Sequence, residues 1–168
     1  RYASISSTTG WTGSGSSATK SITYNSSYGT LPTVSKPGHT FNGWYTAASG
    51  GSKITANTTM STTSNHTIYA HWTANSYKLT LNADGGSIPS SSGWTGSGAS
   101  VYRNITYGTM YGQLPEPNRT TSCDGYKFVG WYTEKNGKGT VISGIRPYSE
   151  TGNQTLYAYR TYNGDCYD

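Results

Sequence analysis

The feature that most constrains this chain is an internal repeat. Three segments occur twice, in the same order. They are ITYNSSYGTLP (22–32) with ITYGTMYGQLP (105–115), GHTFNGWYT (38–46) with GYKFVGWYT (125–133), and HTIYAHWT (66–73) with QTLYAYRT (154–161). The paired segments lie 83, 87 and 88 positions apart. Self-similarity at a nearly fixed spacing indicates copies of one structural unit. We therefore expect two tandem domains, residues 1–75 and 76–168, the second with an insertion and a C-terminal tail.

Each unit has the residue pattern of strands joined by turns. Residues 77–83 (YKLTLNA) alternate between apolar and polar, which is typical of a half-buried strand. The ITY segments at 22–24 and 105–107 are expected to form the next strand of each unit. No window longer than about ten residues has helical periodicity.

Two further segments of the first unit are also expected to be strands. Side chains alternate between the two faces of a strand, so a strand over 39–46 would have Phe41 and Tyr45 on one face and Trp44 on the other. A strand over 66–72 would have Ile68 and Trp72 on one face. We expect four or five strands in each unit.

Aromatic residues supply much of the apolar side-chain area. Leu, Ile, Val and Phe together number only 19 of 168 residues, whereas there are 16 Tyr and 5 Trp. Only 11% of residues are charged, so the chain lacks the charge density of disordered proteins. Thr and Tyr favour strands, and the 22 Gly favour turns. The composition therefore predicts a β-rich protein whose small cores depend on aromatic rings.

The distribution of charged and apolar residues argues against two classes of partner, nucleic acids and membranes. The net charge is +5, and residues 1–83 contain no carboxylate side chain, but the basic residues are scattered singly. A nucleic-acid surface needs clustered bases, so we expect no nucleic-acid partner. No apolar run is long enough for a membrane helix, so we expect no membrane insertion. Weak attraction to anionic cell-envelope polymers stays open. The missing initiator Met is consistent with a processed or excised piece.

The residue pattern does not support catalysis, a metal or a cofactor. General acid–base chemistry needs a carboxylate or a partnered His, and the first unit contains no Asp or Glu. Its histidines His39, His66 and His71 align with Tyr126, Gln154 and Tyr159 of the second unit. Any function that both copies share cannot rest on them. We expect no enzyme activity, no metal site and no cofactor.

A glycine-rich loop, GWTGSG, occurs once in each unit and carries Trp11 and Trp94. A phosphate-binding loop of the Walker type needs a Lys directly after its last Gly, and here Ser16 and Ala99 follow. We interpret the loop as an enlarged hairpin turn. Its Trp either packs on its own unit or a neighbouring one, or stacks on a sugar ring, and the sequence leaves both open.

The second unit contains the two cysteines, Cys123 and Cys166, whose spacing matches no zinc or redox motif. They form either a disulfide or free or intermolecular thiols. Six asparagines precede a Ser or Thr by two positions and are candidate N-glycosylation sites: Asn25, Asn57, Asn65, Asn104, Asn118 and Asn153.

The joint pattern NADGG…ITYG..YG.LP…G..F.GWYT…LYA.W resembles the Listeria–Bacteroides repeat, also called the internalin B-repeat, over nearly all of both units. This resemblance implies an extracellular module of a bacterial surface protein with a β-grasp (ubiquitin-like) fold, a β-rich α+β class. It implies adhesion or spacing at the cell surface and carries over no binding residues. The two GWTGSG loops and the cysteine-containing insertion depart from the family pattern.

The first unit departs further, because the counterpart of strand 77–83 would precede Arg1. Unless residues 1–5 slide back, its sheet has an open slot beside residues 22–24, and an unpaired edge invites another strand. We hypothesise that a neighbouring chain or upstream sequence supplies that strand, with the tail 161–168 as one candidate donor. The function we expect is a structural spacer, adhesin segment or filament subunit. Its partners would be copies of itself, neighbouring repeats, or cell-envelope or host glycans. The alternative is a carbohydrate-binding module using Trp11 and Trp94.

Overall fold

The computed structural model describes residues 2–7, 9–118 and 125–162. The chain divides into two compact units, unit 1 (residues 1–75) and unit 2 (residues 76–168). A residue of unit 1 and the residue at the equivalent position of the repeat in unit 2 are called counterparts. Their numbers differ by 83 for unit 2 residues up to Asn118, by 87 for Tyr126 to Tyr132, and by 88 from Ile142 onward.

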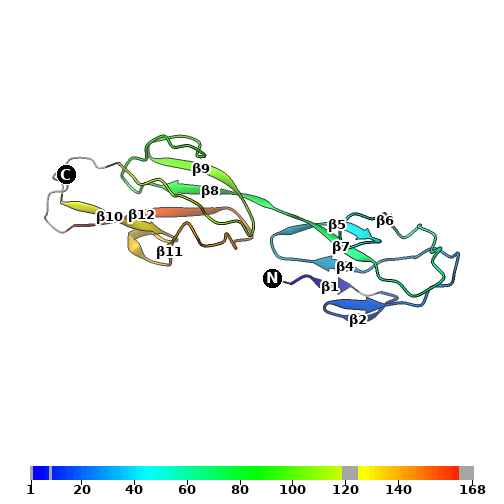
Figure 1. The fold of residues 1–168 in the computed structure, drawn as a ribbon. Coiled ribbons are helices and arrows are strands. Elements are labelled where there is room, and N and C mark those ends of the chain that lie inside the picture. Colours follow the sequence, from blue (N-terminus) through cyan, green and yellow to red (C-terminus); the bar gives the residue numbers. More distant parts are fainter. Residues whose placement is uncertain (1, 8, 119–124, 163–168) are drawn as a thin grey trace. The chain divides into compact units, whose positions relative to one another are not determined.

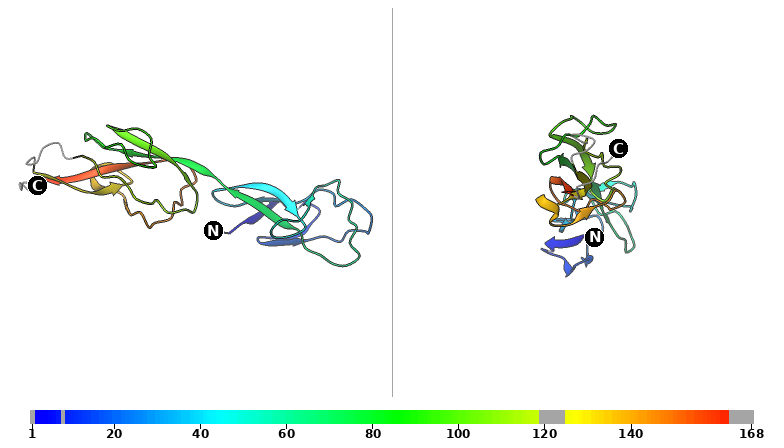
Figure 2. Two further views of the ribbon diagram at one scale, coloured as in Figure 1. Left: turned by 45° about the horizontal axis from the view of Figure 1, so that its top comes forward. Right: turned by 90° about the vertical axis from the view of Figure 1, so that its left-hand side faces the viewer.

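Unit 2 contains a five-stranded mixed sheet in the order β11-β10-β12-β8-β9 (Figure 1). Its strands are β8 (Ser76–Asn82), β9 (Ser100–Thr106), β10 (Tyr126–Tyr132), β11 (Val141–Ile142) and β12 (Gln154–Tyr162). The first and last strands, β8 and β12, are parallel neighbours at the centre. In Figure 2 the green β8 and the orange-red β12 run side by side. All other pairings in this sheet are antiparallel.

Unit 1 contains the same later strands but a smaller sheet. Its three-stranded sheet has the order β6-β5-β7, with β5 (His39–Tyr45), β6 (Lys53–Ile54) and β7 (Tyr69–Ala74). Two small ladders stand apart from it: β1 (Ser4–Ser7) with β4 (Thr33–Ser35), and β2 (Thr12–Ser14) with β3 (Ser17–Thr19). The strand expected at 22–24 does not form, although two residues of its counterpart, Ile105 and Thr106, lie in β9.

A β-bulge in β5 corrects one prediction about side-chain direction. The pairing with β7 shifts register between Phe41 and Gly43, so one extra residue enters the strand. Phe41 and Trp44 therefore lie on the same face, with ring centroids 5.7 Å apart. Tyr45 lies on the opposite face, where it stacks on His71 at 3.9 Å. Strict alternation fails here because a bulge inverts the period beyond it.

The two units differ in the size of their cores. Unit 2 buries twelve apolar residues around Leu79, Leu81, Leu156 and Trp131. The described residues of unit 1 form a core cluster of three, namely Tyr28, Ile54 and Met60. Aromatic rings contribute to both cores, as the composition predicted. The β-rich class is confirmed, because the only helical segment among the described residues is the single turn η1 (Lys135–Gly137).

Candidate functional site

The first candidate site is the edge of β7. Among the described residues, β7 pairs with β5 and with no strand on its other side. Its counterpart β12 pairs with β10 on one side and with β8 on the other. Residues 4–7 do not slide back to this edge, because β1 pairs with β4. The first unit thus lacks a strand at the place where unit 2 has β8.

The second candidate site is the GWTGSG loop of unit 2, where the Trp lies against its own unit. Trp94 is half-buried and packs against the core. The guanidinium carbon of Arg103 lies 5.3 Å from the centre of its ring, within the range of a cation–π contact. The same guanidinium donates a hydrogen bond through Nη2 to the carbonyl oxygen of Tyr111. The Nε of Arg103 is buried and has no hydrogen-bond partner among the described residues.

Unit 1 repeats this arrangement with Lys in place of Arg. Lys20 Nζ lies 5.9 Å from the centre of the Trp11 ring and donates to the carbonyl oxygen of Tyr28 at 3.0 Å. The indole N–H of Trp11 donates to the carbonyl oxygen of Thr30 at 2.9 Å. Neither cation was predicted from the sequence. One signal was available: a basic residue follows the loop Trp by nine positions in both copies.

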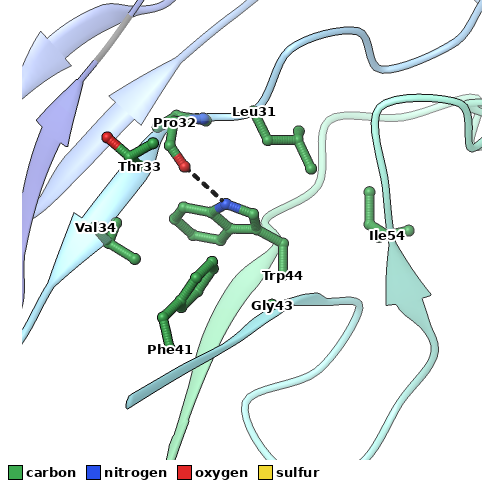
Figure 3. A pocket seen from close by; sticks show the side chains of 8 residues that line it. All are labelled: Leu31, Pro32, Thr33, Val34, Phe41, Gly43, Trp44 and Ile54. Atoms are coloured by element: carbon green, nitrogen blue, oxygen red, sulfur yellow. Dashed lines mark hydrogen bonds between the residues drawn. The ribbon is translucent and has the colours of Figure 1, made fainter. Parts of the chain in front are cut away.

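An apolar pocket lies over the same face of β5 as Trp44 (Figure 3). Its volume is about 460 Å³, and one wall is formed by residues 31–34, which lead into β4. The indole N–H of Trp44 donates to the carbonyl oxygen of Pro32 at 3.1 Å. Its counterpart Trp131 makes the same hydrogen bond to Pro115 at 3.0 Å, but its ring is only 3% exposed. Unit 1 leaves the matching ring half-buried.

Two tyrosines of unit 2 are buried with satisfied hydroxyls. Tyr148 donates to the carbonyl oxygen of Gly152 at 2.6 Å, and Tyr111 donates to the side-chain oxygen of Gln154. Their ring centroids are 5.3 Å apart. Burial raises the pKa of both hydroxyls above the usual value for tyrosine. Both side chains therefore stay neutral and act as core residues.

The remaining predicted residues are scattered over the two units. All six glycosylation candidates are exposed: Asn25, Asn57, Asn65, Asn104, Asn118 and Asn153. Cys123 and Cys166 lie outside the described residues. The histidines make separate contacts: His66 hydrogen-bonds the Tyr28 hydroxyl at 2.7 Å, and His71 bonds the carbonyl oxygen of Ala47 at 2.8 Å.

The described part of the chain contains no cluster of three or more His, Cys, Asp or Glu side chains that could hold a metal ion. Over the same ranges, no helix has the length and apolar character needed to cross a bilayer.

Comparisons with known proteins match both units. A family model described as the Listeria-Bacteroides repeat domain matches residues 9–71 and 77–159. Internalin H of Listeria monocytogenes serovar 1/2a is 38% identical over 136 residues, which cover 80% of this chain and 21% of that protein. The chain thus spans about a fifth of the length of this relative. No solved structure matches the chain.

Proposed function

The chain belongs to the Listeria-Bacteroides repeat domain family, and from this premise we propose that it is a structural repeat segment of a bacterial surface protein. The observation that carries the proposal is that two consecutive units repeat the same contacts inside themselves. In each unit the GWYT tryptophan bonds the proline carbonyl, and the loop tryptophan meets a cation held by a tyrosine carbonyl. Residues repeated in this way maintain a fold, which suits a spacer or an adhesin stalk.

The proposed location is extracellular, at the cell surface. The family resemblance and the similarity to Internalin H support it. The test is antibody labelling of the source bacterium with antibodies raised against the 168-residue chain. Intact cells should be labelled as strongly as permeabilised cells. Labelling that requires permeabilisation would contradict a surface location.

The proposed role is non-enzymatic. Unit 1 contains no carboxylate side chain, so a reaction shared by the two copies would lack the acid or base that most hydrolytic sites use. The basic surface, with a net charge of +5, also favours weak contact with anionic envelope polymers. Binding of this kind should weaken steeply as salt rises, and co-sedimentation with purified cell walls at low and high salt measures it.

A filament or self-associating form is a further version of the same proposal. The open edge of β7 supports it, because a strand edge without a partner can pair with another chain. Sedimentation velocity over a wide concentration range tests it. Species that grow with concentration are expected for a filament subunit, and a monomer at every concentration excludes that version while leaving the spacer role intact.

The alternative, a carbohydrate-binding module, depends on Trp11 and Trp94 being available to a sugar ring. The contacts favour the structural role, because each indole faces a cation of its own unit. A glycan array with the natural chain and with the Trp11→Ala/Trp94→Ala double variant separates the two. A glycan signal that the double variant loses would favour carbohydrate binding, and no signal from either would eliminate it.

The β-grasp fold is proposed for both units on the basis of the family resemblance. The mixed sheet of unit 2, with its first and last strands parallel at the centre, supports this assignment. Unit 1 would adopt the same fold once a strand occupied the place of β8.

A further inference from the structure

The last strand of unit 1 is shorter than its counterpart by a specific set of residues. β12 begins at Gln154, whereas β7 begins at Tyr69, the counterpart of Tyr157. The three residues 154–156 pair with β8 alone, because the ladder with β10 reaches only to Tyr157. Their counterparts, residues 66–68, lie outside any strand. The residues of unit 1 that are not in a strand are thus the counterparts of those that pair only with β8 in unit 2.

The segment on the other side of the slot shows the same dependence. All seven residues of β9 pair with β8, from Ser76 with Thr106 to Asn82 with Ser100. The counterparts of β9 are residues 17–23. Only Ser17–Thr19 form a strand there, and they pair with β2. Residues 20–23 lie outside any strand. The two segments that would border a counterpart of β8, residues 20–23 and 66–68, are therefore both outside any strand.

Burial changes in the same region. Six apolar positions that unit 2 buries are only half-buried in unit 1. They are Ile5, Ala18, Ile22, Trp44, Ile68 and Ala70, the counterparts of Ile88, Val101, Ile105, Trp131, Leu156 and Ala158. Tyr28, Ile54 and Met60, by contrast, are buried, and so are their counterparts. Unit 1 thus has counterparts of apolar side chains that share one core with Leu79 and Leu81 of β8 in unit 2, but no counterpart of β8 itself among its described residues.

We propose that the slot of unit 1 takes an extended segment joined to the chain ahead of Arg1. This segment runs parallel to residues 66–69 and antiparallel to residues 17–23, as β8 does between β12 and β9. The proposal rests on the structural role proposed above and replaces its self-associating version, because that version needs the same open edge of β7 for another chain. A module completed by the strand that precedes it forms part of a continuous array.

Chain connectivity identifies the source of the strand. In unit 2 only residues 83–86 separate the end of β8 at Asn82 from Ser87, which bridges to Asn118. Ser4 pairs with Ser35, the counterpart of Asn118, so β1 already lies where residues 87–90 lie in unit 2. A strand in the slot that runs in the direction of β8 therefore ends a few residues before Ser4. A segment ahead of Arg1 reaches it without crossing the unit.

The structure also specifies the residue pattern of the strand. Leu79, Leu81 and Ala83 of unit 2 are fully buried, whereas Lys78 is exposed on the other face. The occupant therefore has apolar residues at alternate positions, with a small one last. A slip by one residue would turn its apolar side chains to solvent.

The experiment adds residues 76–83 (SYKLTLNA) directly ahead of Arg1 in the full chain, because residues 1–3 are the counterparts of residues 84–86. The control exchanges Lys78 with Leu79 and Thr80 with Leu81 within the added copy only, so the composition is unchanged and the apolar face is inverted. Amide hydrogen exchange reports residues 17–23 and 66–69, and the sheet of unit 2 serves as an internal reference for folding.

We expect exchange at residues 66–68 and 20–23 to slow by at least about tenfold in the fused chain and not in the control. The unfolding midpoint of unit 1 should rise by roughly 10 °C. Exchange identical in the fused chain and the control would overturn the proposal. So would equal protection by the free peptide or by raising the concentration of the unmodified chain, because those results assign the slot to another molecule. None of these outcomes affects the test of surface location.

Discussion

The open slot predicts that the same truncation has unequal costs in the two units. Leu156 is fully buried, and its Cα partner in the ladder is Leu81 of β8. Its counterpart Ile68 is half-buried beside the open edge. The matched changes Leu156→Ala and Ile68→Ala each remove three carbons, so the difference between them reports the surroundings and not the chemistry.

The magnitudes follow from burial. Three carbons at about 0.8 kcal/mol each contribute roughly 2.4 kcal/mol of transfer free energy, and the closed cavity raises the cost of Leu156→Ala to about 3–4 kcal/mol. Ile68→Ala removes a group that already contacts solvent and leaves no closed cavity. Its cost should be about 1 kcal/mol. Because unit 2 has fewer than 100 residues, its unfolding midpoint should fall by about 15 °C or more.

Amide exchange in the two cores measures these costs separately. The free energy of unfolding is followed at Leu79 for unit 2 and at Tyr28 for unit 1, because both are buried. Each variant should affect its own unit and leave the other as an internal standard. Equal losses from the two substitutions would contradict an open slot in unit 1, since they would mean that Ile68 is as well covered as Leu156.

Three further predictions concern single residues. Burial raises the pKa of Tyr148, so unit 2 should lose stability above pH 10, by up to about 1.4 kcal/mol per pH unit, and Tyr148→Phe should flatten this slope in urea unfolding at alkaline pH. The sign follows because the unfolded tyrosine releases its proton first. Gly43→Ala should cost about 1–2 kcal/mol in thermal unfolding, since Gly43 has φ +124° and an added Cβ would lie 2.7 Å from a carbon of the Lys53 side chain. Its control is Gly152→Ala, where an added Cβ meets nothing within 4 Å and stability should change by less than about 0.5 kcal/mol. Trp94→Ala should cost about 3 kcal/mol in urea unfolding and Trp11→Ala less, because only Trp94 packs against a buried core; equal costs would contradict this assignment.

Local patterns were sufficient to predict most of the strands. Alternation located β8 and the GWYT strands, because side chains on a strand repeat every two residues whatever surrounds them. The cations Lys20 and Arg103 were missed because their partners are remote ring faces and carbonyl oxygens, which no local pattern reveals.

Two predictions failed because they depended on partners. Phe41 and Trp44 share a face only because a bulge forms in the pairing of β5 with β7. Residues 22–24 and 105–107 have the same sequence, ITY. Ile105 and Thr106 lie in β9, whereas residues 22–24 lie outside any strand. Hydrogen-bonded pairing, and not the intrinsic preference of ITY, decides whether the strand forms.

From the amino-acid sequence alone it follows that the chain contains two copies of one unit, and that this unit is rich in β-strands. Both follow from residue identity and spacing, which need no knowledge of contacts. The tertiary structure decided where the loop tryptophans lie, and that β1 pairs with β4 and leaves the edge of β7 open. These outcomes depend on which distant backbone and side-chain groups satisfy one another, and identical local sequences find different partners in the two units.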